Sequence, residues 1–275
     1  MAGRLLGVDH STVSRKLESL EAELGGPLFE RGPNGFTATS LGEEVAAAAE
    51  FMEDATVSLM RRLEGASVGL SGTVRVTTTP ILANLVFAPA LREFWRDYPS
   101  LDVELVGVDR SLDLSRREAD IAVRMSRSDV PGLVVKRLNE LAFAFYARER
   151  NDRDFQEQRF LIYEDEAGSA ALQKYQASLI KPAQVVMRSN SLQALLAAAA
   201  SGFGCALLPC FAAEGTTLVR VPAPNAMPTL TLWLHYHEDL RRSPRVKAAV
   251  KFIGDVMGRH RDAMVPPGFQ LDNVT

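Results

Sequence analysis

The sequence has little of several features that would define a class of protein. Only two cysteines occur, Cys205 and Cys210, so there is no disulfide framework, the thiols are expected to be buried small apolar groups, and the cytoplasm is the expected compartment. The most apolar stretch, Leu192 to Pro209, is broken by Gly202 and Gly204, which disfavours a membrane-spanning helix. The first residues lack the apolar segment of a signal peptide.

Positive charge is also in short supply. The formal net charge is −3, with 31 lysines and arginines against 34 acidic residues, so any binding of nucleic acid must come from local placement of basic residues. Apolar residues make up 47% of the sequence, enough for an ordinary globular core. A chain of 275 residues suits two or three domains.

Motifs for catalysis or metal binding fail when their context is considered. Gly65-Ala66-Ser67-Val68-Gly69 has the spacing of a serine-hydrolase elbow, but a predicted helix precedes it and a strand follows, the reverse of that motif. Gly202-Phe203-Gly204 leads into a predicted strand, which is wrong for a dinucleotide loop. His235 and His237 share a strand face without a cysteine or carboxylate at ligand spacing. We therefore expect no enzyme, no cofactor and no metal.

Three regions differ in pattern along the chain. Residues 1–36 indicate a short helix, a turn, a second helix and a hairpin, and residues 39–64 indicate one long amphipathic helix before the flexible linker Gly65 to Gly72. From Thr73 onward, β-rich runs alternate with helical patterns, which predicts an α/β class with parallel strands in two lobes. The predicted strands are Thr73–Thr78, Asp102–Val106, Ile121–Val123, Leu141–Ala147, Phe160–Tyr163, Gln184–Arg188, Cys205–Leu208 and Thr229–Tyr236.

The segment from Arg4 to Arg15 has the composition of a helix-turn-helix. Gly7 permits a sharp turn, and Asp9 is placed to cap the next helix. Apolar residues of that helix, spaced by four, three and four, predict one buried stripe of Val13, Leu17, Leu20 and Leu24. Short polar or basic residues lie on its other faces near the helix start, where a recognition helix contacts bases, namely His10, Ser11, Ser14 and Arg15. An ordinary capped surface helix fits this pattern equally well.

The following segment separates these alternatives. It contains Leu20-Glu21-Ala22-Glu23-Leu24-Gly25, Leu28-Phe29-Glu30-Arg31 and Thr39-Ser40-Leu41-Gly42. Together with Val13-Ser14-Arg15, this pattern closely resembles the LysR-type transcriptional regulators. The resemblance implies a winged helix-turn-helix for double-stranded operator DNA, with the wing at Gly32 to Phe36 and a backbone contact from Arg31. It also implies that the residues facing DNA are His10, Ser11, Thr12, Ser14 and Arg15.

One departure from the family pattern concerns the start of the sequence. Family members have a further helix before the one that begins near Ala2, and it packs beneath the recognition helix. This sequence lacks that helix, so we expect either a misplaced start at Met1 or a shortened member of the family. We therefore expect Val13, Leu17 and Leu20 to be partly uncovered, at a cost of a few kcal/mol at about 25 cal/mol per Å².

The long helix carries a narrow apolar seam in heptad spacing, made of Leu41, Val45, Ala48, Met52, Ala55 and Leu59. Ser40 with Glu43 fits a capping box, with Thr39 as the competing cap. The narrow seam favours a homodimer, and the alternative is that the helix packs on its own C-terminal domain. The resemblance implies a homodimer or homotetramer.

Three more segments resemble the family's ligand domain: Gly72 to Val76, Arg117 to Arg124 and Ala199 to Pro209. The resemblance implies a two-lobed α/β domain of the periplasmic-binding-protein-like type 2, with chain crossings near Ala144–Ala147 and Thr229–Trp233. The expected domains are a winged helix-turn-helix over 1–38, a dimerisation helix over 39–64 and an effector-binding domain over 72–265, with lobe I at 72–145 and 232–260 and lobe II at 146–231.

Two strand-to-helix junctions are candidates for the effector site. Thr77, Thr78 and Thr79 end the first predicted strand, and Ser189, Asn190 and Ser191 open another helix. Hydroxyls and free amides at such places favour an anion or carboxylate, although routine capping explains them equally well. Arg124 is placed either to pair with a ligand carboxylate or to form a structural ion pair. A DNA-binding regulator modulated by a small-molecule effector is thus favoured over the alternative, a binding protein or enzyme that uses the two lobes alone.

Overall fold

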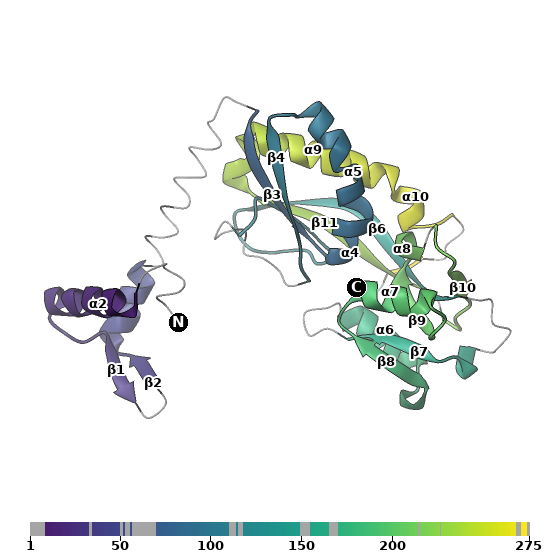
Figure 1. Cartoon of the computed structure of the whole chain (residues 1–275), viewed down its shortest axis with the longest axis horizontal. Coiled ribbons are helices and arrows are strands. Elements are labelled where there is room, and N and C mark those ends of the chain that lie inside the picture. The colour runs from purple at the N-terminus through teal and green to yellow at the C-terminus, as the bar shows by residue number, and fades with distance from the viewer. Residues whose placement is uncertain are drawn as a thin grey trace. The chain divides into compact units, whose positions relative to one another are not determined.

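The computed structural model describes most of the chain and divides it into two compact units, Met1–Met60 and Arg61–Thr275 (Figure 1). The described residues are 9–32, 35–49, 52, 56, 70–109, 114, 118–148, 155–164, 170–213, 215–225, 227–267 and 271–273. The predicted turn at Gly7, the hydrolase-like motif at 65–69, seam residues Ala55 and Leu59, and the side chains of His10 and Arg31 lie outside this description.

The N-terminal unit has the predicted order of helix, hairpin and helix. Its elements are α2 (His10–Leu24), β1 (Phe29–Gly32), β2 (Gly35–Ala38) and a helix over residues 40–49. Strands β1 and β2 pair antiparallel, with Phe29 opposite Ala38. Gly25 caps the C-terminus of α2, and its φ of 77° lies in the left-handed region that glycine adopts without a Cβ clash.

Polar contacts hold the hairpin to the two helices. The Glu21 carboxylate accepts a hydrogen bond from the Leu28 amide at 2.7 Å, and the Thr39 hydroxyl donates to the Pro27 carbonyl at 2.7 Å. Gly42 has no room for a side chain, because a Cβ there would lie 2.1 Å from the Leu28 carbonyl oxygen. Residues Glu21, Thr39 and Gly42 of the family-like pattern are therefore the ones that build this junction.

The helix caps differ in part from expectation. Asp9 stands at the start of α2, but its side chain makes no capping bond. Its backbone carbonyl accepts from the amides of Thr12 and Val13 at 2.9 and 3.2 Å, so the Thr12 amide, one of the two that a capping carboxylate can take, is already bonded. At the next helix Thr39, not Ser40, is the cap: its hydroxyl accepts from the Gly42 amide at 3.0 Å.

Apolar side chains of this unit are only partly covered. Val13 and Leu17 are half-buried, while Leu20 and Leu24 are 38% and 44% exposed. The predicted stripe is therefore only partly covered by the described residues. Within the seam, Leu41 and Val45 are half-buried, Ala48 is exposed and Met52 is 69% exposed.

The C-terminal unit is built on a mixed sheet. Its strands are β3 (Gly72–Thr78), β4 (Leu101–Gly107), β5 (Ile121–Arg124), β6 (Leu133–Ala147), β7 (Phe160–Tyr163), β8 (Val185–Ser189), β9 (Cys205–Pro209), β10 (Val219–Val221), β11 (Met227–His237) and β12 (Leu271–Asn273). The order β4-β3-β5-β11-β6 forms lobe I, and β6-β9-β7-β8 forms lobe II. Strand β6 belongs to both lobes, because residues 133–142 pair with β11 and residues 143–146 pair with β9.

Helices flank these strands (Figure 1). They are α4 (Pro80–Leu82), the π-helix η1 (Ala83–Phe87), α5 (Ala88–Asp97), η2 (Phe155–Glu157), α6 (Ala170–Leu179), η3 (Pro182–Gln184), α7 (Leu192–Ala200), α8 (Cys210–Ala213), η4 (Glu238–Arg242), α9 (Pro244–Arg259) and α10 (Arg261–Met264). Helix α9 contacts α5, β3 and β6, and α7 contacts β7 and β9. Within the described part of the chain, no helix combines the length and the apolar character needed to cross a bilayer.

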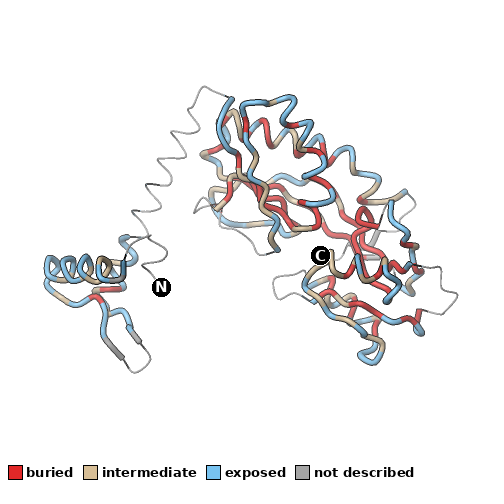
Figure 2. The backbone as a smooth tube through the Cα atoms, in the orientation of Figure 1, coloured by how far each residue is buried: buried red, intermediate tan, exposed pale blue. Residues whose placement is uncertain are grey.

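The predicted strands are all present, which confirms the α/β class. Strand β6 begins at Leu133 rather than Leu141, because polar residues such as Lys136 and Glu140 interrupt the apolar run while the backbone continues to pair with β11. Gln184 belongs to η3, so β8 begins one residue later than predicted. Buried residues concentrate along the central strands of this unit (Figure 2).

Candidate functional site

Three parallel strands of lobe I end at one place. Strand β3 pairs in parallel with both β4 and β5. Arg124, the last residue of β5, donates from Nη2 to the Thr77 hydroxyl oxygen at 2.7 Å and from Nη1 to the Val108 carbonyl at 2.8 Å. Because Val108 directly follows β4, this one guanidinium ties the carboxyl ends of all three strands together, where open α/β sheets bind ligands.

The Arg124 guanidinium is a buried cation. The residue is 6% exposed, and burial lowers its pKa to about 10, although the negative charge of Asp109 opposes this shift. The group therefore stays protonated at neutral pH. Its two side-chain bonds, to a hydroxyl and to a backbone carbonyl, keep positive charge beside the threonine segment.

Two neighbouring hydroxyls have unused hydrogen-bonding capacity. Thr78 and Thr79 are 0% and 6% exposed, and neither Oγ1 atom has a hydrogen-bond partner among the described residues. A buried polar group left without a partner costs about 1–3 kcal/mol. The Thr77 hydroxyl accepts from Arg124, so its own proton remains available to donate. The end of β3 thus gathers three hydroxyls whose protons suit an anion.

The corresponding junction in lobe II uses its hydroxyls locally. Ser191 caps α7, with its hydroxyl oxygen accepting from the Ala194 amide at 3.3 Å. The Ser189 hydroxyl oxygen accepts from the Ser191 amide at 3.1 Å, while Asn190 is exposed. Capping, the alternative interpretation of these serines, is therefore observed.

The two junctions lie on neighbouring elements. Helix α4, which starts directly after Thr79, contacts α7 (Figure 1). The structure thus joins Thr77 to Arg124 directly and places the Ser189–Ser191 segment on the adjacent helix start. Among the described residues, no hydrogen bond links the threonine segment to the serine segment.

Sequence reasoning missed two contributors to this site. Val108 acts through its carbonyl, for which a side-chain pattern carries no signal. His235 is 3% exposed, and its Nε2 accepts from the Ser128 amide at 3.2 Å. Burial lowers the pKa of His235, and the charge of Arg124 lowers it further. From the sequence, a metal-binding role was the one role considered for His235. In the structure, its side chain lies close enough to Arg124 for that charge to lower its pKa.

The buried thiols show no sign of activation. Cys205 and Cys210 are both buried, and burial raises both thiol pKa values, so the sulfurs remain protonated. A thiolate is the reactive form in redox chemistry. In the part of the chain that the structure describes, no group of three histidine, cysteine or acidic residues is arranged to hold a metal ion.

The first turns of α2 present the side chains predicted to face DNA. Ser11 and Arg15 are exposed, and Thr12 and Ser14 are half-buried. The strands of the hairpin β1–β2 include both ends of the predicted wing, with Phe36 75% exposed, while residues 33 and 34 at its tip lie outside the described part of the chain. An exposed helix start with short polar and basic groups matches the geometry of major-groove reading.

Comparison with known sequences agrees with this architecture. Residues 67–258 match the family model of the LysR substrate binding domain, and residues 1–43 match that of the bacterial regulatory helix-turn-helix protein, lysR family. The chain belongs to the LysR-type transcriptional regulators. It is accordingly a DNA-binding transcriptional regulator with an effector-binding domain.

Individual relatives share less than a third of their aligned residues with this chain. The Mau operon transcriptional activator of Paracoccus denitrificans is 25% identical over 262 residues, which cover 93% of this chain and 89% of that protein. The transcriptional activator IlvY of Salmonella typhimurium is 29% identical over 136 residues, 48% of this chain and 46% of IlvY.

Solved structures share the fold. The full-length virulence activator AphB of Vibrio cholerae superposes with a TM-score of 0.55 at 17% identity, covering 93% of this chain and 92% of AphB. The LysR-type regulator CrgA from Neisseria meningitidis gives a TM-score of 0.56 at 20% identity, covering 94% of this chain and 92% of CrgA. Both matches extend over nearly the whole chain, which confirms the predicted architecture.

Proposed function

We propose that this regulator binds a small organic anion between its lobes and couples that binding to operator recognition. The observation that carries the proposal is the pair of buried Thr78 and Thr79 hydroxyls without partners among the described residues. An anion that accepts from both would remove the penalty of two unsatisfied donors. Arg124 would stabilise it through a positive charge already desolvated and fixed in place.

Lobe II would complete the site from the α7 side. The first-turn amides of a helix carry partial positive charge, and those of α7 follow directly after Ser191. In this proposal Ser189 and Ser191 shape the helix start, and exposed Asn190 reaches the ligand. A ligand held by groups of both lobes stabilises one arrangement of the pair, which is how an effector changes the state of a regulator.

At the other end, α2 would enter the major groove with Ser11, Thr12, Ser14 and Arg15, together with His10, while Arg31 contacts phosphates. The domain limits that fit this function are 1–38 for DNA binding, 39–64 for dimerisation and 72–265 for the effector, with lobe I at 72–145 and 232–260 and lobe II at 146–231. The division of the chain near Met60 supports a boundary in that region. No catalytic role is included in the proposal.

We further propose a cytoplasmic homodimer or homotetramer assembled through the long helix. Met52 on the predicted seam is 69% exposed in the single chain, and an isolated helix needs a packed apolar face to persist. Pairing would also present two recognition helices to a pseudo-palindromic operator. Light scattering that returned a monomeric mass at micromolar concentration would contradict this assembly.

The effector site is tested by removing the unpaired hydroxyls without changing shape. Wild type and a Thr78→Val, Thr79→Val double variant are screened by thermal shift against benzoate, salicylate and short aliphatic carboxylates. A ligand at about 100 times its Kd stabilises the folded state by about 2.7 kcal/mol, so wild type should gain stability with at least one anion and the double variant should not. Thr73→Val, at the exposed opposite end of β3, is the matched control. An equal gain in the double variant would rule out the threonine site.

A further inference from the structure

A cavity lies in lobe I, away from the threonine segment. It has a volume of about 430 Å³ and lies between α9, η4 and strands β6 and β11. Leu234 and Tyr236 of β11 line it, and side chains alternate between the two faces of a strand. Trp233 therefore points to the opposite face, and so does Arg124, which pairs with Trp233 across the sheet. The cavity shares no lining residue with the threonine site.

Positive charge is concentrated around this cavity although the whole chain is acidic. One carboxylate, Asp255, stands among five cationic side chains, Lys136, Arg137, Arg241, Lys247 and Lys251. We call this cavity with its cationic rim the basic groove. The formal charge of the chain is −3. The excess of cations around the basic groove is therefore a local feature that the bulk composition does not explain.

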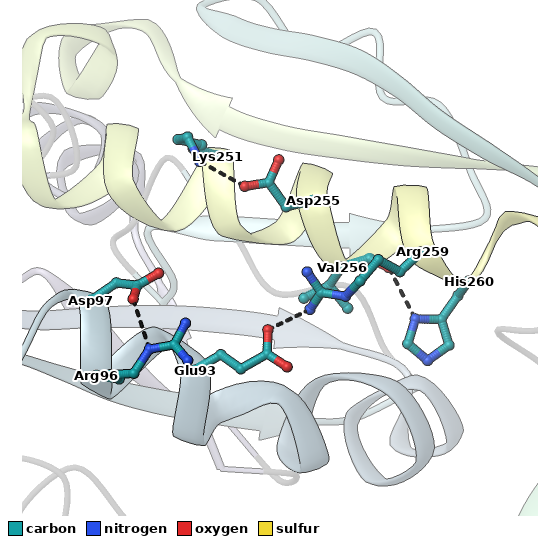
Figure 3. Close-up of polar contacts among 8 residues, drawn as sticks. All are labelled: Glu93, Arg96, Asp97, Lys251, Asp255, Val256, Arg259 and His260. Atoms are coloured by element: carbon teal, nitrogen blue, oxygen red, sulfur yellow. Dashed lines mark hydrogen bonds and ion pairs between the residues drawn. The ribbon is translucent and has the colours of Figure 1, made fainter.

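Some of these cations already have partners. The Nζ atom of Lys251 donates to Oδ2 of Asp255, one turn along α9, at 2.7 Å (Figure 3). Arg137 forms an ion pair with Glu140. The side chains of Arg241 and Lys247 have no ion-pair partner among the described residues. Elsewhere on α9, Arg259 is matched by Glu93 of α5 at 2.8 Å (Figure 3). The side of α9 toward α5 is thus balanced, whereas the groove keeps unmatched positive charge.

The floor of the groove is apolar. Leu240 and Val246 are 3% and 1% exposed, and Leu138 and Val250 are half-buried beside them. The Lys136 ammonium lies 5.8 Å from the centre of the Tyr236 ring, which keeps that charge at the edge of the floor. Sites for small organic ligands combine apolar walls with a few polar groups in about 300–1,000 Å³. A hydrocarbon body with one negative head group matches this lining.

Gly254 keeps the space open. It lines the groove from α9, and a Cβ built there would meet nothing within 4 Å. Glycine is unfavourable inside a helix, so a residue with a side chain would support α9 better but would project into the groove. Gly258, one turn further, also has open space around its Cβ position but lies outside the lining. The two glycines therefore form a matched pair for an experiment.

We propose that the basic groove is a second ligand site, which binds a small carboxylate with an apolar body. The carboxylate contacts Arg241 and Lys247, and the hydrocarbon part lies on Leu240 and Val246. This site is separate from the one proposed between the lobes, so either can exist without the other. Its place between α9 and β6 lets an occupant act on the strand that both lobes share.

The test uses isothermal titration calorimetry of benzoate and octanoate into the full chain at low salt. Gly254→Leu fills the groove and should weaken binding of at least one probe by about tenfold or more, a shift that calorimetry resolves. Gly258→Leu should bind as wild type does. Both leucines favour the helix over glycine, so each variant is expected to fold, which circular dichroism checks. Lys247→Glu should weaken binding as well, with Lys174→Glu on α6 as its control.

Three results would overturn the proposal. One is an absence of binding of either probe to wild type. Another is equal affinity of the Gly254→Leu and Gly258→Leu proteins. The third is binding that disappears in the Thr78→Val, Thr79→Val protein but persists in Gly254→Leu, because this would assign the probe to the site between the lobes alone. Binding that persists in the threonine variant and disappears in Gly254→Leu supports the groove, whatever the fate of the other site.

Discussion

The two units of this chain depend on different kinds of interaction. In the described part of the N-terminal unit, Leu28 is the one hydrophobic residue that is nearly fully buried, whereas buried residues run through the strands of the C-terminal unit (Figure 2). The small unit is instead held by the contacts of Glu21, Thr39 and Gly42. Specific polar groups tolerate few replacements, while an apolar core accepts many. This difference predicts that the first unit is the more sensitive of the two to replacement of single polar or glycine residues.

The largest expected effect comes from the apolar side of this comparison. Phe145 is fully buried, and its ring lies 5.0 Å from that of Phe155 and 5.6 Å from that of Phe160. Phe145→Ala should lower the free energy of unfolding of the C-terminal unit by about 3–5 kcal/mol through the cavity it creates. Hydrogen exchange should show the loss in the lobes and not in residues 9–49. Phe203→Ala, at a side chain 50% exposed, should change stability by less than about 0.5 kcal/mol.

A smaller loss of stability, confined to the N-terminal unit, is expected when one methyl group is added at Gly42. Gly42→Ala places a Cβ 2.1 Å from the Leu28 carbonyl oxygen, so the backbone must move at a cost of about 3 kcal/mol. Gly25→Ala is the control: its Cβ would meet nothing within 4 Å, and its φ of 77° should cost only about 1 kcal/mol. Hydrogen exchange of α2 measures both. Equal losses in the two variants would contradict the steric role of Gly42.

A third variant separates polar groups that hold the fold from those that face DNA. Arg15 is exposed on α2, so Arg15→Ala should leave the melting temperature unchanged. It should weaken binding to a duplex selected from a random library by about 1–3 kcal/mol, the usual value of a specific base contact. Fluorescence anisotropy measures the affinity, with Lys174→Ala in lobe II as the matched control. Unchanged affinity would remove Arg15 from the interface.

The smallest expected effect is a pH dependence of the C-terminal unit. The pKa of His235 is lowered in the folded state, so the unfolded chain binds the proton more readily. The contribution of His235 to stability is therefore present above its ordinary pKa of about 6.5 and is lost as the pH falls through its lowered value. As the pH is lowered from neutral to mildly acidic, the melting temperature of wild type should fall more steeply than that of His235→Gln. Parallel declines would show that His235 does not titrate in this range.

The sequence was sufficient to predict the main strands, although not the short β10 and β12, and it was insufficient to predict how polar groups are used. Alternating apolar patterns located the strands because burial dictates them, but they missed the first half of β6, where backbone pairing with β11 replaces burial. Thr79 and Ser191 looked alike as residues before a helix. Ser191 caps α7, whereas Thr79 leaves its hydroxyl without a partner among the described residues. That choice depends on local backbone angles and on burial by distant residues, neither of which composition records.

The sharing of β6 by both lobes has a mechanical consequence. The strand is 15 residues long and exchanges β11 for β9 near Phe143 without a break in the chain. Because hydrogen bonds hold it on both sides of that point, the lobes cannot slide apart as bodies joined by a flexible tether can. A rotation of this strand within one lobe is therefore transmitted directly to the other lobe, because the same backbone forms part of both sheets.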